Sequence, residues 1–600
     1  MKSRDRHHPD ASACALAFTP SRRSRRCTPS VCAMHHLCNV RTYYNSFCLR
    51  IWLAPCVPPL FVFLCSSFFF EHIRTHSMRR GHTVCSIVIA VAVVCALAVG
   101  GSGSEDGTKP WRDGSRNGTF DGLLPGFASY VRQSAATTSS RLQDQLTVLR
   151  GFSDDPYPAV TRVLFTEHDV KARAYVRGLM VDAGLEVTVD GMGSIIGSWR
   201  TDRADWADRA DDHDSRTHVV VMTGSHTDAI PLAGAYDGVV GVLGGIEAIR
   251  LLREFDGRFR RDGGDPGGGA RLRHPVEFQV VMFASEEPTR FGLSCVASRV
   301  YGGVLGREGV EGLRDGGGIG FEEAARGAGV AVDVEGARAA YRDDGVTRSK
   351  RRYFVELHIE QGKELEDAGL DIGIVTHIAG PASVTVSFKG PGGHAGGLMM
   401  RDRHDASLAA AELALDVEGL VKREGSSDTV GTVGSWQVSP NAVNSVPREV
   451  VLGIDVRDID GPRLDRVVQG VKERAKVVAE KRGVEYAVEV TNHDAPATSS
   501  GRVVEAVGAA AGALKLRSKK MVSRAYHDSL FMGLVSEMGM IFIPCEGGKS
   551  HRPDEFASER DVLHGTQTLA LTMGQLGGLL GEDALRHDDQ VGTDERHSEL

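Results

Sequence analysis

Five short segments, far apart in the sequence, carry side chains of the kinds that bind metal ions. Together they contain His226 and Asp228, Asp237, Glu286 and Glu287, His358, and His551. Imidazole nitrogens and carboxylate oxygens suit divalent ions such as Mn²⁺, Co²⁺ or Zn²⁺. Two such ions that share a carboxylate lower the pKa of bound water, which supplies a nucleophile at neutral pH. The order of these residues therefore predicts a hydrolase with a pair of metal ions.

Neighbouring residues in these segments receive different roles. Glu286 and Glu287 follow an apolar strand, and adjacent residues of an extended chain point in opposite directions. We therefore assign Glu287 as a metal ligand and Glu286 as the general base, which must lie within hydrogen-bond reach of the attacking water. Asp228 is expected to accept the second N–H of His226 and so fix the tautomer that binds metal. Asp237 precedes a predicted helix, where capping is the commoner role of an aspartate, but the neighbouring ligands favour metal binding.

His358 and His551 are the last two predicted ligands along the chain. Glu356, His358 and Glu360 alternate with hydrophobic residues, which predicts that they share one face of a strand. His551 follows a predicted buried strand at 540–544 and a glycine-rich turn. A lone histidine in either setting is more often an ordinary core or surface residue. The ordered set of five segments is what favours metal binding.

Strands and helices alternate in the first part of the chain that carries these residues. The sequence predicts strands at 185–189, 218–222 and 276–284, and helices at 170–183 and 238–254. Thr166 to Asp169 has the composition of a capping box at the start of the first helix. The alternation predicts an α/β fold with a mostly parallel sheet covered on both faces. Ligands gather at the carboxyl ends of strands in such a sheet, and His226 follows one of them.

The pattern changes after residue 378. The sequence then predicts strands at 382–388, 429–437, 449–457 and 485–491, and helices at 406–421 and 462–482. Alternating polarity in these strands predicts an α+β block whose sheet is solvated on one face. The earlier pattern resumes with a helix at 503–513 and the strand before His551. We therefore expect a catalytic domain in two parts, 106–377 and 496–582, a block inserted at 378–495, and a disordered polar tail at 583–600.

Composition limits the class of protein. The net charge is −8 and no domain is basic, so there is no electrostatic basis for nucleic-acid binding. Nine of the eleven cysteines precede residue 100, and only Cys295 and Cys545 lie in the globular part. Two distant cysteines are not a disulfide framework. Both are expected to be buried as small hydrophobic residues.

Residues 1–105 form an N-terminal extension. Its segment 78–104 joins a basic stretch, an apolar run at 84–99 and small residues, which is the layout of a signal peptide. We expect a location in the endoplasmic reticulum or the secretory pathway, with no stable membrane span after removal of this segment. The alternative is a membrane anchor at 51–70 or 84–99. Asn117 begins a glycosylation sequon that fits the secretory route.

Longer motifs carry a family resemblance from Val160 to Gly581. They are GSHTDAIPLAGAYDGVVGVLG, FASEEPTRFG, ELHIEQG, GPGGHAG, NAVNSVP, DVRDID, RAYHDSLFM and GKSHRPDE. With them the sequence resembles the dinuclear metal amidohydrolases, a family that includes aminoacylases and the hydrolases of N-carbamoyl amino acids, allantoate and ureidoglycolate. The stretches Ser285–Gly292 and Arg524–Leu530 are most similar to the members that cleave ureidoglycolate. Relatives that cleave allantoate tend to carry Gly-Ala-Gly-His-Asp where this chain has Arg-Ala-Tyr-His-Asp.

The resemblance implies two Mn²⁺ ions per subunit, for which Co²⁺, Ni²⁺ or Zn²⁺ can substitute. The implied ligands are His226, Asp237, Glu287, His358 and His551, with Asp237 as the bridge. The inserted block is implied to be a lid through which a homodimer forms. His394 matches a lid histidine that reaches the active site of the other subunit and stabilises the oxyanion.

The remaining matches concern a small anionic substrate. They are Asn444 and Arg457 on the lid, and Gln361, Tyr526 and His527 in the pocket. A guanidinium such as that of Arg457 can bind a carboxylate through two hydrogen bonds. Ordinary alternatives stay open: Arg457 could pair with Asp455 or Asp458, Asn444 could be a turn residue, and His394 a loop residue without consequence.

The expected reaction is hydrolysis of the ureido C–N bond of (S)-ureidoglycolate, which leads to glyoxylate, ammonia and CO₂ in purine catabolism. Tyr526 discriminates between substrates, because a bulky ring there shrinks a pocket that must hold the larger allantoate. The alternatives are allantoate and an N-carbamoyl amino acid such as β-ureidopropionate. A non-catalytic binding protein is a further alternative, against which the complete set of ligands and base argues.

Overall fold

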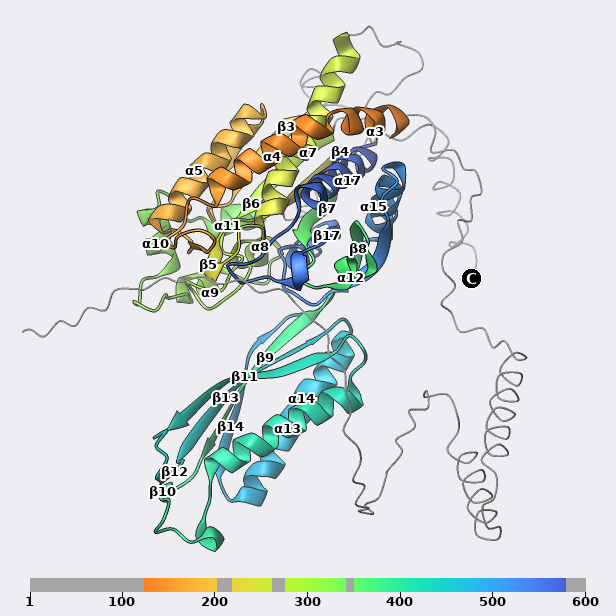
Figure 1. The fold of residues 1–600 in the computed structure, drawn as a ribbon. Helices are drawn as coiled ribbons and strands as arrows, with labels where there is room; N and C mark the ends of the chain where they lie inside the picture. Colours follow the sequence, from red (N-terminus) through yellow and green to blue (C-terminus); the bar gives the residue numbers. More distant parts are fainter. Residues whose placement is uncertain (1–123, 202–217, 262–275, 342–349, 579–600) are drawn as a thin grey trace, which may run out of the picture. The chain divides into compact units, whose positions relative to one another are not determined.

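The structure is a computed structural model that describes residues 124–201, 218–261, 276–341 and 350–578 (Figure 1). Several predicted features lie outside these ranges, namely the segment at 78–104, the run at 51–70, the sequon at Asn117 and the tail at 583–600. Among the described residues, no helix is both long and apolar enough to cross a membrane.

A sheet of nine strands forms the centre of the catalytic part, in the order β15-β8-β17-β7-β4-β6-β3-β2, with β16 also paired to β8. The strands are β2 (Glu186–Val189), β3 (Ile195–Arg200), β4 (His218–His226), β6 (Val276–Phe283), β7 (Lys350–Ile359), β8 (Ile372–Ile378), β15 (Ala497–Thr498), β16 (Ser518–Ser523) and β17 (Glu537–Ile543). Strands β6, β4, β7 and β17 are parallel, as are β8 and β16. The other pairings are antiparallel. The predicted α/β class is confirmed. The sheet is mixed rather than mostly parallel, because as many of its pairings are antiparallel as parallel.

Helices cover both faces of this sheet. They are α3 (Leu124–Gln133), α4 (Ala135–Leu149), α5 (Glu167–Asp182), α7 (Val239–Arg261), α8 (Val296–Tyr301), α9 (Arg307–Gly312), α10 (Phe321–Gly327), α11 (Val334–Ala339), α12 (Glu364–Ala368), α15 (Gly501–Ala513), α16 (Ser529–Met532) and α17 (Glu559–Leu576). The long helices α4, α5, α7 and α17 lie together over one face (Figure 1). A short antiparallel pair, β1 (Val160–Arg162) with β5 (Ala229–Ala233), lies apart from the main sheet.

The alternation along β7 decides which face carries polar residues. Val355 and Leu357 belong to the apolar core that packs against α7 and α17. Phe354 belongs to the opposite core, which contains residues of α8 to α11 and α16. Glu356 and His358 have the same parity as Phe354, so both lie on this second face, as the sequence pattern predicts.

The start of α5 differs from the predicted capping box. The helix begins at Glu167, but the Thr166 side chain donates to the Val163 carbonyl at 2.7 Å instead of capping the helix. The Asp169 carboxylate accepts the backbone N–H of Phe165 at 2.7 Å. The two side chains thus close the turn before the helix, because local hydrogen bonds of this kind compete with capping.

The inserted block has its own sheet of four antiparallel strands, in the order β11-β13-β9-β14. These are β9 (Gly380–Lys389), β11 (Val430–Ser439), β13 (Glu449–Asp458) and β14 (Glu485–His493). Two helices, α13 (Ala406–Glu424) and α14 (Gly461–Arg482), pack on one face of it and form a separate apolar core. Residues of β13 alternate between buried and partly exposed, as expected for a sheet with one solvated face.

Short elements complete the block. They are β10 (Gly393–His394), β12 (Ser445–Val446) and the 3₁₀ turn η1 (Met400–Asp402), while η2 (Glu546–Gly548) precedes His551 in the catalytic part.

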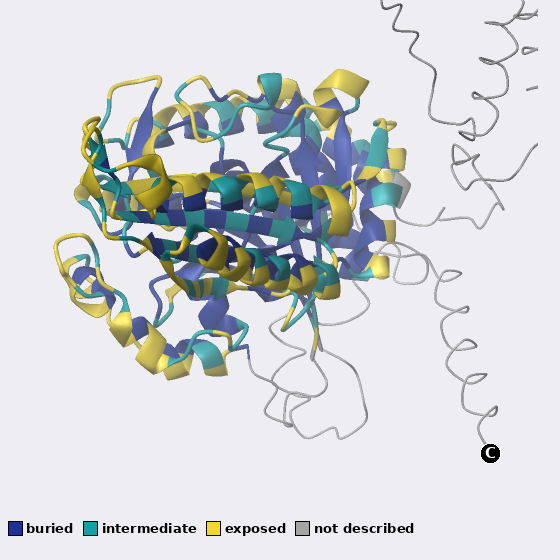
Figure 2. Ribbon diagram, turned by 90° about the horizontal axis from the view of Figure 1, so that it is seen from below, coloured by how far each residue is buried: buried dark blue, intermediate teal, exposed yellow. Residues whose placement is uncertain are grey.

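In Figure 2 the helices carry buried and exposed residues in bands along their length, as amphipathic helices over a core do.

Candidate metal centre

The predicted ligands meet at the carboxyl ends of three adjacent parallel strands. His226 is the last residue of β4, His358 lies one residue before the end of β7, and Glu287 follows β6. Asp237 precedes α7, and His551 follows η2. Strand ends of this kind meet at one edge of a parallel sheet, which explains how segments so distant in sequence converge.

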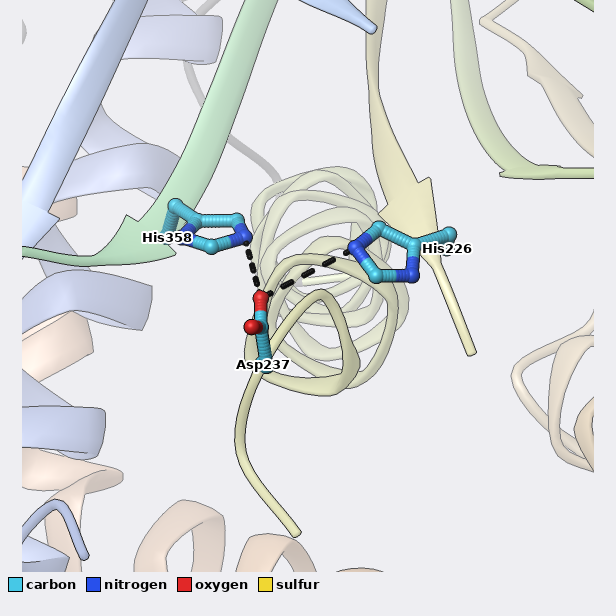
Figure 3. Close-up of side chains that lie close together, drawn as sticks. All are labelled: His226, Asp237 and His358. Atoms are coloured by element: carbon cyan, nitrogen blue, oxygen red, sulfur yellow. Dashed lines mark ion pairs between the residues drawn. The ribbon is translucent and has the colours of Figure 1, made fainter. Parts of the chain in front are cut away.

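One group of donors consists of His226, Asp237 and His358, all buried. The Asp237 Oδ1 lies 3.0 Å from His358 Nε2 and 3.8 Å from His226 Nε2. Figure 3 shows both imidazoles turned towards this carboxylate from different strands. Two nitrogens and one carboxylate oxygen converge here on one position.

A second group uses the other oxygen of the same carboxylate. Asp237 Oδ2 lies 3.1 Å from His551 Nε2, which in turn lies 3.3 Å from Glu287 Oε1. Donor atoms of Asp237, Glu287 and His551 all lie within 4.8 Å of one another. Each oxygen of Asp237 therefore faces a different set of donors, which is the arrangement of a carboxylate that bridges two sites.

Backbone carbonyls fix the tautomers of two histidines. His226 Nδ1 lies 2.9 Å from the Asp228 carbonyl oxygen, and His358 Nδ1 lies 2.9 Å from that of Ile359. Because a carbonyl only accepts, each Nδ1 carries a hydrogen, and Nε2 is the nitrogen that can bind a metal once any proton on it has been displaced.

The predicted hydrogen bond from His226 to the Asp228 carboxylate is wrong, because the backbone carbonyl of Asp228 accepts this bond instead. The carboxylate Oδ1 lies 3.8 Å from the imidazole Nδ1, beyond hydrogen-bond distance. Its Oδ2 instead accepts the backbone N–H of Glu287 at 3.1 Å, and burial raises the pKa of Asp228 to about 6. Asp228 thus orients one ligand through its carbonyl and holds the backbone of another through its side chain.

Electrostatics favour cations at this position. Although burial opposes it, hydrogen bonds with His358 and His551 hold the pKa of Asp237 well below its usual range. Burial alone would lower the pKa of His358, but its bond to Asp237 raises it to about 9. Hydrogen bonds to Asp237 and Glu287 raise the pKa of His551 to about 10. These pKa shifts mean that the site stabilises positive charge. Its imidazole and carboxylate donors therefore fit divalent metal ions.

Glu286 lies beside the first group. Its Oε2 is 3.5 Å from His226 Nε2, and its Oε1 accepts from the Cys295 thiol at 3.3 Å. Strand β6 ends at Phe283 and Ser285 has a φ of 61°, so the two glutamates lie in a turn rather than on the strand. Burial, followed by the negative charge of Glu287, raises the pKa of Glu286 well above its ordinary value, which favours uptake of a proton.

Two predicted pocket residues contact the ligands directly. Gln361 Nε2 donates to Asp237 Oδ2 at 2.9 Å and to Ser550 Oγ at 3.1 Å. The His527 ring meets the His358 ring edge to face, with 4.6 Å between centroids. Burial, and then the charge of His358, lower the pKa of His527 well below its usual value, so it is neutral.

The lid residues have their hydrogen-bond partners outside this cluster. His394 pairs with Ser445 across β10 and β12, and the Ala395 N–H donates to the Asn444 carbonyl at 2.9 Å. Arg457 Nε donates to Asp455 at 2.8 Å, so the ordinary pairing considered for it does form. In the part of the chain that the structure describes, no hydrogen bond or ion pair links His394, Asn444 or Arg457 to the five ligands.

Sequence reasoning missed several residues of the site, among them Glu555 and Cys295. Glu555 Oε1 accepts the backbone N–H groups of Tyr236 and Asp237 at 2.8 and 3.0 Å. Glu555 is the last residue of the motif GKSHRPDE, in which only His551 was assigned a role from the sequence. Cys295 was expected only to be buried, and nothing in its local sequence indicates its contact with Glu286.

Comparison with known proteins identifies the family. The pattern of peptidase family M20/M25/M40 matches residues 269–575. A ureidoglycolate hydrolase from Arabidopsis thaliana is 46% identical over 455 residues, which cover 74% of this chain and 88% of that protein. An N-carbamoyl-L-amino acid amidohydrolase from Geobacillus stearothermophilus is 34% identical over 73% of this chain and 98% of that one. The crystal structure of AtUAH in complex with glyoxylate superposes with a TM-score of 0.59 at 46% identity, covering 73% of this chain and 97% of that one.

The fold and the donor set are those of a metal-dependent hydrolase. The chain belongs to the peptidase family M20/M25/M40, which confirms the family relationship predicted from its motifs.

Proposed function

We propose that this hydrolase cleaves the ureido C–N bond of (S)-ureidoglycolate, leading to glyoxylate, ammonia and CO₂ in the breakdown of allantoin-derived ureides. The observation that carries the proposal is the Asp237 carboxylate, whose two oxygens face separate sets of metal-type donors beside a buried glutamate. Similarity to the Arabidopsis ureidoglycolate hydrolase over most of the chain supports the choice of substrate.

The proposed cofactor is a pair of Mn²⁺ ions per subunit. His226 and His358 would hold one ion, Glu287 and His551 the other, and Asp237 both. Bound there, the ions would polarise the ureido carbonyl and lower the pKa of bound water. The same nitrogen and oxygen donors also accept Co²⁺, Ni²⁺ or Zn²⁺.

Glu286 is the proposed general base. Its Oε2 lies at the edge of the first donor group, 3.5 Å from His226 Nε2, where it can take a proton from a water molecule. The water oxygen bonds to the ureido carbon, the C–N bond breaks, and Glu286 returns the proton to the leaving nitrogen.

Substrate binding is assigned to Gln361, His527 and Tyr526 in the catalytic part and to Arg457 and Asn444 on the lid. Arg457 Nη1 donates to the Arg524 carbonyl at 2.8 Å, two residues before Tyr526. This contact supports a role for the guanidinium near the substrate carboxylate, because it brings the lid strand β13 to the loop that carries His527.

We propose that the protein acts as a homodimer in which His394 serves the active site of the other subunit. The Nδ1 of His394 accepts the N–H groups of Gly396 and Gly397 at 3.2 and 3.0 Å, so Nε2 carries the hydrogen of the neutral ring. An exposed N–H donor of this kind suits an oxyanion. Val443 and Met400, exposed at 103% and 69%, lie close in sequence to β12 and β10 respectively and offer apolar surface for a second subunit.

Allantoate and N-carbamoyl amino acids are the alternative substrates. A panel of (S)-ureidoglycolate, allantoate and β-ureidopropionate, assayed with Mn²⁺ on protein that starts near Asp106, distinguishes them. Release of ammonia and glyoxylate from ureidoglycolate at the highest kcat/KM is expected. Ammonia from allantoate without any from ureidoglycolate would refute the proposed substrate.

The signal-like segment at 78–104 supports a proposed location in the endoplasmic reticulum or the secretory pathway. Sequencing the N-terminus of protein isolated from cells tests this. A mature protein that retains residues 78–104 would contradict it.

A further inference from the structure

Arg299, in α8, is a buried arginine with 4% of its surface exposed. Its Nη1 and Nη2 donate to the two oxygens of Asp494 at 2.8 and 2.6 Å. Asp494 directly follows β14, the last strand of the inserted block. The guanidinium also lies 4.4 Å from the centroid of the Phe531 ring. A buried pair with two parallel hydrogen bonds holds all these groups in one geometry.

The hydroxyl of Tyr526 has all its hydrogen-bond partners within the same network. The phenolic oxygen accepts from Asn492 Nδ2 at 2.6 Å and from Arg299 Nη2 at 3.0 Å. Its hydrogen is donated to Asp494. A phenol has one hydrogen to donate, so none is left for a substrate. Tyr526 can therefore act on a substrate through its ring, which is stacked at 19° to the ring of Phe531, and not through its hydroxyl as a donor.

The loop that carries Tyr526 runs between two parts of the proposed site. On one side the Arg524 carbonyl accepts from Arg457, and on the other the His527 ring lies against the metal ligand His358. A small acid held between the metal ions and Arg457 would lie along this loop. Tyr526 itself is only partly buried, so its ring has surface left for contact.

We infer that Arg299 is a positioning residue: it holds the Tyr526 ring as a rigid wall beside the substrate, and this wall excludes the larger diureido acid. The inference rests on the proposed function, because it concerns the choice between ureidoglycolate and allantoate. It assigns selectivity to a buried ion pair at the point where the inserted block rejoins the catalytic part.

The test compares kcat/KM for ureidoglycolate and allantoate in Tyr526→Phe and Arg299→Lys. Tyr526→Phe keeps the ring and removes only the hydrogen bonds that fix it. Arg299→Lys keeps the charge beside Asp494, but one ammonium cannot reproduce the planar set of donors. In each variant the ratio of ureidoglycolate to allantoate kcat/KM should fall by about tenfold or more, the usual effect of a hydrogen bond to a charged group. The fall should come from a higher KM for ureidoglycolate and faster cleavage of allantoate. In Arg299→Lys, kcat for ureidoglycolate should stay nearly unchanged.

A double variant separates positioning from general destabilisation. If Arg299 acts through the Tyr526 hydroxyl, Arg299→Lys should change the ratio by less than about twofold in the Tyr526→Phe background. Tyr130→Phe is the matched control, because it removes a 2.7 Å bond from a phenol to Glu254, in the C-terminal part of α7. It should leave the ratio unchanged, and the thermal midpoint of each variant reports on folding.

Unchanged ratios in both single variants, or full additivity in the double variant, would overturn the inference while leaving the proposed function intact. A fall in kcat for ureidoglycolate in Tyr526→Phe without faster allantoate cleavage would also overturn it, since the hydroxyl would then serve the substrate directly. A wild-type protein that cleaves allantoate but not ureidoglycolate would refute the inference and the proposed function together.

Discussion

Replacing Glu555 with alanine is expected to weaken Mn²⁺ binding, although Glu555 belongs to neither group of metal-type donors. Its Oε1 accepts the N–H groups of Tyr236 and Asp237 at 2.8 and 3.0 Å. Its Oε2 accepts from Ser550 Oγ at 3.2 Å, one residue before the ligand His551. Glu555 thus ties together the backbone of the bridging ligand and the loop of another ligand.

The expected size follows from these bonds. Alanine leaves two N–H groups of the bridging segment without their acceptor, at about 1–3 kcal/mol for each buried group. Part of this cost is shared by the metal-free protein, so the affinity for Mn²⁺ should fall by about 10- to 100-fold, as for other residues that orient ligands. Calorimetric titration of metal-depleted protein with Mn²⁺ measures the change.

Two further variants make this result specific. Glu555→Gln keeps a carbonyl oxygen for the two N–H groups, so its affinity should stay within about threefold of wild type. Glu559→Ala removes an exposed glutamate in the first turn of α17 and should have no effect. An unchanged affinity in Glu555→Ala, with an unchanged thermal midpoint, would refute the reasoning.

The remaining predictions concern catalysis and protons. Glu286→Gln should lower kcat by about 10²- to 10⁴-fold and leave the metal content measured by elemental analysis unchanged; loss of metal would contradict its role as base. Equal amounts of inactive Glu286→Gln and His394→Ala protein, mixed and allowed to exchange subunits, should regain about a quarter of wild-type activity, since half of the dimers then hold one complete site; no recovery would argue that His394 acts within its own subunit. The pKa values of His358 and His551 are raised to about 9 and 10 without metal, so both imidazoles are positively charged at pH 7.5. Mn²⁺ binding should therefore release about two protons per chain, and the affinity for Mn²⁺ should increase as the pH rises towards 9. Calorimetry in buffers of different ionisation enthalpy measures this release, and a value near zero would contradict it.

Periodic patterns in the sequence were sufficient for most of the architecture. The alternation in β7 predicts that Glu356 and His358 share a face, and they do, because strand geometry imposes a period of two. Antiparallel pairing at β3 and β15 was not predictable in this way. Periodicity reports which face of a strand is buried, but says nothing about the direction of its neighbour.

The site was predictable where a residue type alone limits the chemistry. His226 at the end of an apolar strand and His358 on the face of another could be assigned as donors because they belong to an ordered set of metal-type residues. The contacts of Asp228, Cys295 and Glu555 could not, because they depend on the turn at Ser285 and on a partner 318 positions away in the chain. Tertiary packing decides such contacts, and the local sequence does not record it.

The bridging role of Asp237 is tested most directly by anomalous scattering from crystals of the Mn²⁺-loaded protein. Two manganese peaks per chain are expected, one beside His226 and His358 and the other beside Glu287 and His551, each within ligand distance of one oxygen of Asp237. A single peak, or two peaks of which only one contacts Asp237, would contradict the account.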